Sequence, residues 1–214
     1  MNKKKHAHNL IKKLIISHSS LEVCKNEILN AYEMLYDVFV NAGKVLVCGN
    51  GGSAADCEHI VGELMKGFKL KRPLETDERA LFAKQEHDDI TDFLQGSLPA
   101  ISLVSQTALI SAISNDINFE YIFAQQVYGY GKKGDAVIAL STSGNAKNII
   151  NACITAKALG LIVIGFTGET GGLLKKYCDV CICVPFSDTA AVQEKHLPIY
   201  HAVCAALELT FWME

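Results

Sequence analysis

A histidine and a glutamate stand four positions apart, His59 and Glu63, shortly after a glycine-rich turn. At this spacing both side chains project from one face of a helix. An imidazole and a carboxylate together can transfer protons or hold a metal ion. The turn, Gly49-Asn50-Gly51-Gly52-Ser53, precedes the expected helix and would leave backbone N–H groups free to bind an anion. An anion site beside these two side chains predicts an active site.

A second turn, rich in hydroxyl groups, predicts phosphate binding. Ser141-Thr142-Ser143-Gly144 follows a buried-strand pattern and precedes a helical one, so three hydroxyls and several N–H groups would meet at a helix start. The first turn matches neither nucleotide-binding pattern, because no lysine follows its glycines and Ala54 replaces the last glycine of G-x-G-x-x-G. This argues against a nucleoside triphosphatase and a dinucleotide enzyme. Two hydroxyl-rich turns without lysine or arginine suit a sugar phosphate.

The last helical segment offers further ligands at Gln193, Glu194, His196 and His201. Helical spacing places Glu194 beside His201 as readily as it places Gln193 there. Pro198 removes one backbone hydrogen bond and should kink this helix. Residue spacing therefore does not decide whether Gln193 or Glu194 lies beside His201. We expect His196 by itself to lie on the surface.

Short apolar runs alternate with helical patterns through most of the chain. Strands are expected at residues 45–48, 99–104, 136–140, 161–166 and 178–184, and helices at 107–114, 119–130, 146–159 and from 189 onwards. This alternation predicts an α/β domain with a parallel sheet covered on both faces. Ligands of such sheets bind beyond the carboxyl ends of the strands, where both turns fall.

Two segments do not follow this alternation. Residues 10–42 predict two helices broken near residues 17–20, and the basic residues 1–8 are expected to form a solvated, frayed end. Residues 69–98 form an unusually long, charged connection. Two surface helices are the favoured interpretation of this excursion, with a catalytic lid or a subunit contact as alternatives.

Composition excludes several classes of protein. At 214 residues, half hydrophobic and a fifth charged, the chain suits one folded domain spanning residues 1–214. Its formal charge of −3 gives no general attraction to nucleic acid or to an anionic membrane. Neither a secretory signal pattern nor a run of membrane-spanning length is found, so we expect a cytoplasmic protein.

The chain has eight cysteines, most of them in apolar patterns where a reduced thiol behaves as a small hydrophobe. Cys178 and Cys181 form a C-x-x-C pair, a pattern found in zinc and redox sites. No second Cys or His pair has matching spacing, and the pair belongs to a strand-like run. A buried strand is therefore the favoured interpretation.

Taken in order, six motifs resemble the phosphoheptose isomerase family, whose members have the sugar isomerase (SIS) fold. They are CGNGGS at 48–53, His59-x-x-x-Glu63, Asn115-Asp116, STSGN at 141–145, TG-x-x-GG at 167–172 and QE-x-H at 193–196. The resemblance implies a three-layer sandwich with a five-stranded parallel sheet, and a homotetramer with active sites between subunits. It also implies interconversion of sedoheptulose 7-phosphate and D-glycero-D-manno-heptose 7-phosphate, which supplies heptose for lipopolysaccharide or capsule.

The resemblance further implies the roles of individual residues. The zinc ligands would be His59, Glu63, Gln193 and His201. The substrate contacts would be Asn50, Gly51, Gly52, Ser53, Glu63, Asn115, Asp116, Ser141, Thr142, Ser143 and Gln193. Glu63 would be the base that shuttles a proton through an enediol, and His201 its partner acid, while zinc polarises the carbonyl. Because Glu63 would be both ligand and base, we hypothesise that it leaves the metal during turnover.

Three features depart from the family pattern. Ala146 stands where the STSGNS run has its last serine, Ala191 replaces an arginine, and the excursion at 69–98 is longer than the family's connection. These departures concern the exact sugar more than the reaction. Two non-catalytic alternatives exist within the fold: a partner-binding protein of the replication-initiator-associating type and a sugar-phosphate sensor. The intact Glu63 and STSG run favour the enzyme over the first, and the complete ligand set favours it over the second.

Overall fold

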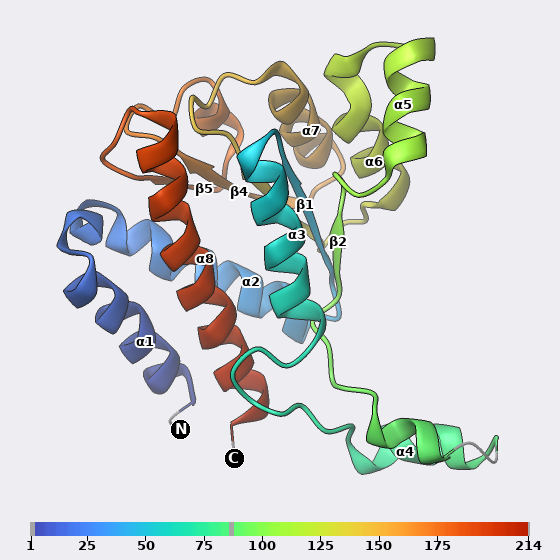
Figure 1. Cartoon of the computed structure of the whole chain (residues 1–214). Helices are drawn as coiled ribbons and strands as arrows, with labels where there is room; N and C mark the ends of the chain where they lie inside the picture. The colour runs from blue at the N-terminus through green and yellow to red at the C-terminus, as the bar shows by residue number, and fades with distance from the viewer. Residues whose placement is uncertain (1–2, 86–87, 214) are drawn as a thin grey trace.

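The computed structural model describes residues 3–85 and 88–213, and in these ranges the chain forms one parallel sheet of five strands (Figure 1). The strands are β1 (Val45–Gly49), β2 (Ala100–Ser102), β3 (Ala136–Leu140), β4 (Ile162–Thr167) and β5 (Val180–Cys183), in the spatial order β2-β1-β3-β4-β5. Most strand residues are apolar and buried, because helices cover both faces. The five predicted strands are confirmed, with ends that differ by a few residues.

The two turns that carry the candidate site lie side by side at the carboxyl edge of the sheet. β1 pairs in parallel with both β2 and β3, so the strand order reverses at β1. Gly49 at the end of β1 pairs with Leu140 at the end of β3, which places the turns that follow next to each other. Ligands of open α/β sheets bind at such a crevice. The expectation that both turns share this edge is confirmed.

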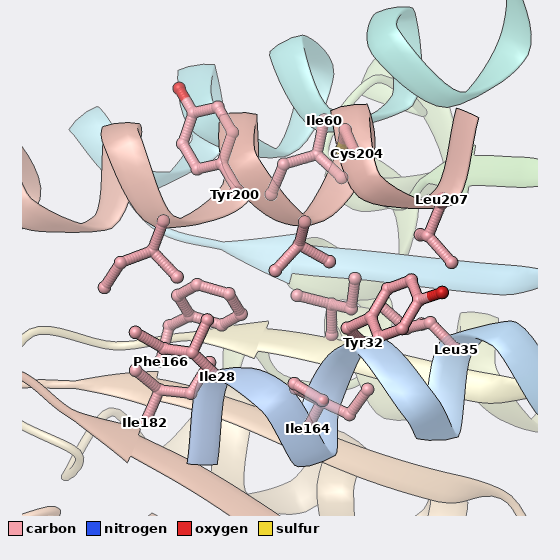
Figure 2. Packing of buried hydrophobic residues seen from close by; sticks show 14 of the residues in the cluster. Ile28, Tyr32, Leu35, Ile60, Ile164, Phe166, Ile182, Tyr200, Cys204 and Leu207 are labelled. Carbon is pink, nitrogen blue, oxygen red and sulfur yellow. The ribbon is translucent and has the colours of Figure 1, made fainter. Parts of the chain in front are cut away.

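Helices on both faces give three layers. One layer contains α1 (Lys3–Ser17), α2 (Lys25–Val40), α3 (Gly52–Met65) and α8 (Thr189–Trp212); the other contains α5 (Thr107–Asp116), α6 (Ile122–Tyr130) and α7 (Lys147–Ala158). Side chains alternate across β1, so Val47 packs on the first layer and Leu46 on the second. Figure 2 shows residues of α2 and α8 pointing toward one another in the larger apolar cluster. The predicted fold class is confirmed.

The remaining described helices are short. They are α4 (Thr76–Ala83) and the 3₁₀ helices η1 (Ser19–Cys24), η2 (Asp88–Asp92), η3 (Phe119–Tyr121) and η4 (Leu174–Tyr177). α8 continues through Pro198 as a single helix. None of the described helices combines the length and apolar character needed to cross a bilayer.

The amino-terminal helix starts earlier than the sequence predicted. The break between α1 and α2 lies near residues 17–20 as expected, but α1 already begins at Lys3. Ala7 and Ile11 are fully buried against the rest of the first layer, and Lys4 pairs with Glu33 at 2.7 Å. The prediction of a frayed end is therefore wrong for residues 3–8, because one face of this basic segment is apolar. Residues 1–2 lie outside the described residues.

The excursion at 69–98 projects from the molecule at the end of α3 that is farthest from the glycine-rich turn (Figure 1). Helix α4 has no buried residue and its start is closed by a capping box between Glu75 and Glu78. Arg79 pairs with Asp92 at 2.7 Å and thereby ties α4 to η2. The prediction of surface helices is confirmed for the described part; residues 86–87 lie outside it.

A buried ion pair joins the end of α3 to α8. The side chains of Arg72 and Glu208 are 0% and 1% exposed, and Arg72 Nε donates to Glu208 Oε1 at 2.8 Å. The other two guanidinium nitrogens donate to the backbone oxygens of Glu63 at 2.8 Å and Leu64 at 2.7 Å. These carbonyls belong to the last turn of α3, which lacks helical partners for them. Trp212 covers the guanidinium, whose carbon lies 4.5 Å from the ring centroid.

The carboxylate of Glu208 also has hydrogen-bond donors at both of its oxygens. Its two oxygens also accept from the backbone N–H groups of Phe68, Lys69 and Leu70, at 2.7, 2.8 and 3.1 Å. Burying two charges is tolerated only when their remaining donors and acceptors are bonded, as they are here. The loop after α3 is therefore fixed to the last helix.

We expect Glu208→Gln to lower the free energy of unfolding by about 3–5 kcal/mol, because it leaves the Arg72 guanidinium buried without a counter-charge. Urea unfolding followed by circular dichroism measures the loss. Lys25→Gln, which breaks an exposed ion pair with Glu22, is the control and should cost no more than about 1 kcal/mol. A cost for Glu208→Gln as small as that of the control would show that the buried Arg72 guanidinium does not need the Glu208 carboxylate as its counter-charge.

Candidate active site

Three helices begin around one cavity at the carboxyl edge of the sheet. The cavity has a volume of about 290 Å³ and includes the first residues of α3, the residue before α7 and the first residue of α8. Its lining is uncharged and consists of Asn50, Gly51, Gly52, Ser53, Leu140, Ser141, Thr142, Ser143, Ala146, Thr189 and Gln193. Each helix start presents backbone N–H groups and the positive end of a helix dipole. We call this cavity the phosphate cradle, because it suits a phosphate held without lysine or arginine.

Two glycines give the cradle its shape. Gly51 has φ of +57° and ψ of −123°, a conformation that other residues rarely adopt. At Gly52 an added Cβ would lie 2.7 Å from both amide atoms of Gln193. The absence of side chains here therefore lets the turn reverse sharply and lets α8 approach the start of α3.

An asparagine pair that sequence reasoning missed connects two sides of the cradle. Asn50 and Asn148 exchange two side-chain hydrogen bonds, each 2.9 Å long. Asn148 Oδ1 also accepts from the backbone N–H of Ile149 at 3.0 Å. The turn after β1 is thus tied to the first turn of α7. The only signal in the sequence was an asparagine three residues after the STSGN run, in the first turn of the helix that follows.

A second group of predicted residues lies farther along α3. His59 Nε2 is 3.1 Å from Glu63 Oε1 and 3.2 Å from His201 Nε2. His59 and Glu63 share one face of α3, as their spacing predicted, and His201 comes from α8, which lies beside α3 (Figure 1). One ligand atom of each residue lies within 4.8 Å of the others. The structure therefore brings together three of the four predicted metal ligands.

The donor set of this group fits a divalent metal ion. Two imidazoles and a carboxylate are common zinc ligands. Glu63 Oε2 is buried and has no hydrogen-bond partner among the described residues, so this oxygen is available to a metal or a substrate. Burial, and secondarily the neighbouring His59, lower the pKa of His201, which favours the neutral ring that binds metals.

Tyr200 and Asp56 form a chain of hydrogen bonds that ends at His59, and sequence reasoning identified neither residue. Tyr200 Oη lies 3.1 Å from His59 Nδ1 and donates to Asp56 Oδ1 at 3.1 Å. Burial raises the pKa of the Tyr200 hydroxyl, which therefore keeps its proton. A metal-binding histidine is usually oriented through its second nitrogen in this way. Asp56 is three residues before His59 on α3, and this spacing was the signal available in the sequence.

The other predicted residues fall in two places. Gln193 lies at the phosphate cradle against Gly52, and the exposed Glu194 does not join His201. Asn115 and Asp116 end α5, bond to each other at 2.8 Å and do not line the cradle of this chain. Their assignment as substrate contacts stays a prediction.

His196 is buried, so its predicted surface position is wrong. The side chain is 0% exposed, with Nε2 3.3 Å from the backbone oxygen of Thr167 and the ring edge-on to Phe166. Burial lowers the pKa of His196 to about 4. The ring faces the sheet because α8 turns this side inward, which the sequence alone did not show.

Comparison with known proteins gives consistent matches. The family model described as SIS domain matches residues 14–96 and 90–168. The phosphoheptose isomerase of Roseiflexus sp. (strain RS-1) is 37% identical over 199 residues, which cover 93% of this chain and 89% of the relative. The phosphoheptose isomerase of Clostridium acetobutylicum is 40% identical over 182 residues, covering 85% and 81%.

Solved structures extend the likeness to the fold. A phosphoheptose isomerase from Francisella tularensis superposes with a TM-score of 0.74 and 29% identity, covering 97% of this chain and 98% of the other. The phosphoheptose isomerase from Neisseria gonorrhoeae gives a TM-score of 0.70 with 29% identity, covering 96% and 92%. The likeness therefore extends over nearly the whole length of both chains.

Ala146 is the residue before α7, lines the cradle and makes no side-chain cap. We expect Ala146→Ser to raise the free energy of unfolding by about 0.5–1 kcal/mol by capping α7. The added hydroxyl should also tighten the binding of inorganic phosphate several-fold. Calorimetric titration with phosphate measures this, and Ala146→Gly is the control. Unchanged or weaker phosphate binding by the serine variant would contradict the assignment of the cradle.

The buried His196 should make stability depend on pH. Its pKa is lower in the folded chain than the ordinary 6.5, so the stability it supports is complete above about pH 6.5 and is lost as pH falls towards 4. The pKa difference corresponds to about 3 kcal/mol. We expect His196→Phe to remove this part of the pH dependence in urea unfolding at pH 7 and pH 4. His18→Gln is the control, and equal pH dependence of wild type and His196→Phe would refute the prediction.

Proposed function

This chain belongs to the phosphoheptose isomerase family of SIS domain proteins, and on that premise we propose that it interconverts sedoheptulose 7-phosphate and D-glycero-D-manno-heptose 7-phosphate through an enediol. It is an aldose–ketose isomerase. The observation that best supports the route is the buried, unpartnered Oε2 of Glu63, on the same helix whose start forms the phosphate cradle.

The arrangement along α3 suits a sugar with its phosphate and its carbonyl at opposite ends. Ser53 in the cradle and His59 in the second group are six residues apart, which is about 9 Å along a helix. A heptose 7-phosphate bound with its phosphate at the three helix starts would extend its first two carbons towards Glu63. Binding energy at the phosphate would then fix the position of the reacting carbons.

Glu63 is the proposed base. Its carboxylate takes a proton from C1 of the ketose, and the electron pair of that C–H bond forms the enediol double bond as O2 gains a proton from His201. Returning the proton from Glu63 to C2, while O1 gives up its hydrogen to His201, forms the aldose. Oε1 of Glu63 faces His59, whereas Oε2 has no partner among the described residues, so one carboxylate can be oriented and still accept a proton.

His59, Glu63 and His201 would hold the proposed zinc ion. When bound, zinc would polarise the substrate carbonyl and stabilise the negative charge that develops on its oxygen. Three protein ligands leave a position open, as catalytic zinc sites do. Gln193, the predicted fourth ligand, lies at the cradle, and we propose that it contacts the substrate there.

The assembly and setting are further parts of the proposal. A homotetramer with sites between subunits would explain why Asn115 and Asp116, predicted to contact substrate, do not line the cradle of this chain. We also propose a cytoplasmic role in supplying heptose for lipopolysaccharide or capsule. A partner-binding protein of the replication-initiator-associating type and a sugar-phosphate sensor are not favoured, because the relatives are isomerases and neither role needs the His59, Glu63 and His201 group.

The reaction is tested by incubating the protein with sedoheptulose 7-phosphate in D₂O and following the sugar by NMR. We expect the aldose with deuterium at C2, because a proton held on Glu63 exchanges with solvent. Activity should fall with a chelator and return with zinc. Aldose without deuterium would contradict exchange at the base, and absence of turnover with phosphate binding retained would contradict the isomerase.

Glu63→Gln should reduce kcat by about 10²–10⁴-fold, because the amide cannot accept the proton. The matched control is Glu58→Gln on the same helix, whose carboxylate bonds to Ser105 at 2.8 Å away from the group. Control activity should stay near that of the wild type. A Glu63→Gln variant as active as Glu58→Gln would exclude Glu63 as the base.

A further inference from the structure

The ligand atoms of the candidate metal group lie close together, but an imidazole binds a metal ion only through a nitrogen that carries no hydrogen. His59 Nε2 lies 3.1 Å from Glu63 Oε1 and 3.2 Å from His201 Nε2, so Nε2 is the atom of His59 that would face the ion. A neutral imidazole carries its one hydrogen on either Nδ1 or Nε2. Metal binding by this group therefore requires a contact that keeps the hydrogen of His59 on Nδ1.

The hydroxyl of Tyr200 supplies such a contact. Its oxygen lies 3.1 Å from His59 Nδ1 and 3.1 Å from Asp56 Oδ1. A phenol has one hydrogen to donate and a carboxylate can only accept, so the hydroxyl donates to Asp56. Towards His59 the same oxygen can then act only as an acceptor, which places the ring hydrogen on Nδ1. The lone pair on Nε2 is left facing Glu63 and His201.

The ring of Tyr200 is held too firmly for the hydroxyl to turn away. Tyr200 is 2% exposed and belongs to the larger apolar cluster, and in Figure 2 its hydroxyl points away from the other labelled residues of that cluster. The ring is edge-on to both imidazoles, with its centroid 5.4 Å from that of His59 and 5.0 Å from that of His201. Close packing holds a buried ring in one position. One residue of α8 thus contacts both histidines of the group and orients His59 through its hydroxyl.

We propose that Tyr200 and Asp56 are positioning residues of the zinc site: Asp56 takes the hydroxyl hydrogen of Tyr200, and Tyr200 thereby holds His59 in the tautomer that binds metal. This inference rests on the proposed function, because the zinc ion is part of it. Neither residue is among the proposed ligands, and Asp56 acts on His59 through Tyr200. Removing a group that is bonded to the second nitrogen of a ligand histidine typically weakens metal binding about 10–100-fold.

Two substitutions test the hydroxyl and the direction of its hydrogen bond separately. Tyr200→Phe keeps the ring and removes the hydroxyl. Asp56→Asn keeps the shape, but its amide can donate to the Tyr200 oxygen, which lets the hydroxyl donate to Nδ1 and moves the hydrogen of His59 to Nε2. Each variant should bind zinc about 10–100-fold more weakly than the wild type, as measured by competition with a chromophoric chelator. Wild-type zinc affinity in Tyr200→Phe would overturn the proposal.

The matched control is Tyr32→Phe, which removes another buried tyrosine hydroxyl, one that bonds to Thr210 Oγ1 at 2.8 Å. Its zinc affinity should equal that of the wild type. The double variant that combines Tyr200→Phe with Asp56→Asn separates the hydrogen-bond chain from the mere loss of a nearby charge. If Asp56 acts through Tyr200, its substitution should add little once the hydroxyl is gone. Full additivity of the two losses in zinc affinity would overturn the proposal.

The tautomer of His59 can be measured without zinc. In the metal-free wild type at pH 8, where an ordinary histidine is neutral, long-range ¹H–¹⁵N correlation NMR should show the hydrogen of His59 on Nδ1. The His59 signal is identified by its absence in His59→Gln. Asp56→Asn should move the hydrogen to Nε2.

A hydrogen on Nε2 in the wild type would refute the proposal even if every variant failed to fold. Failure of the proposed function is distinguishable from this outcome. A wild type that has its hydrogen on Nδ1 and binds zinc more tightly than Tyr200→Phe, yet does not turn over sedoheptulose 7-phosphate, would contradict the isomerase and support the positioning role.

Discussion

The geometry of the candidate active site depends on the buried contact between Arg72 and Glu208. Arg72 binds the last carbonyls of α3, including that of Glu63, and Glu208 on α8 holds both Arg72 and the backbone that follows α3. α3 carries His59 and Glu63, and α8 carries His201. The ion pair therefore fixes the two helices that must place their side chains within hydrogen-bond distance. Its saturation with hydrogen bonds is what makes burying two charges tolerable.

The proposed phosphate binding and the proposed proton transfer would occupy different parts of α3. The helix start contributes N–H groups and dipole to an uncharged cradle, where two further helices also begin. The next turns contribute a carboxylate with an unpartnered oxygen and an imidazole held by Tyr200. One rigid element thus sets the distance between the proposed phosphate site and the proposed base. Such rigidity is what positioning a small substrate requires.

The candidate metal group and the phosphate cradle differ in chemistry as well as in place. The candidate metal group has two imidazoles and a carboxylate, a donor set that suits a divalent cation. The phosphate cradle is uncharged and offers hydroxyls and backbone N–H groups, which suit an anion. Both draw on α3 and α8, the cradle on the first residues of these helices and the candidate metal group on residues farther along them.

The sequence by itself determined the elements and the local motifs. Apolar runs and helical periodicity predicted all five strands, and the spacing of His59 and Glu63 placed both on one face of α3, because these properties depend on residues close together in the chain. Only the tertiary structure decided which distant residues meet. It brought His201 and Tyr200 to His59, joined Asn148 to Asn50, buried His196 and started α1 at Lys3. It also left Cys178, Cys181 and Cys183 only half-buried, so the prediction of a buried strand for the C-x-x-C pair is wrong in that respect. These outcomes depend on how helices rotate and pack on the sheet, and a periodic pattern does not record that rotation when several faces of a helix are apolar.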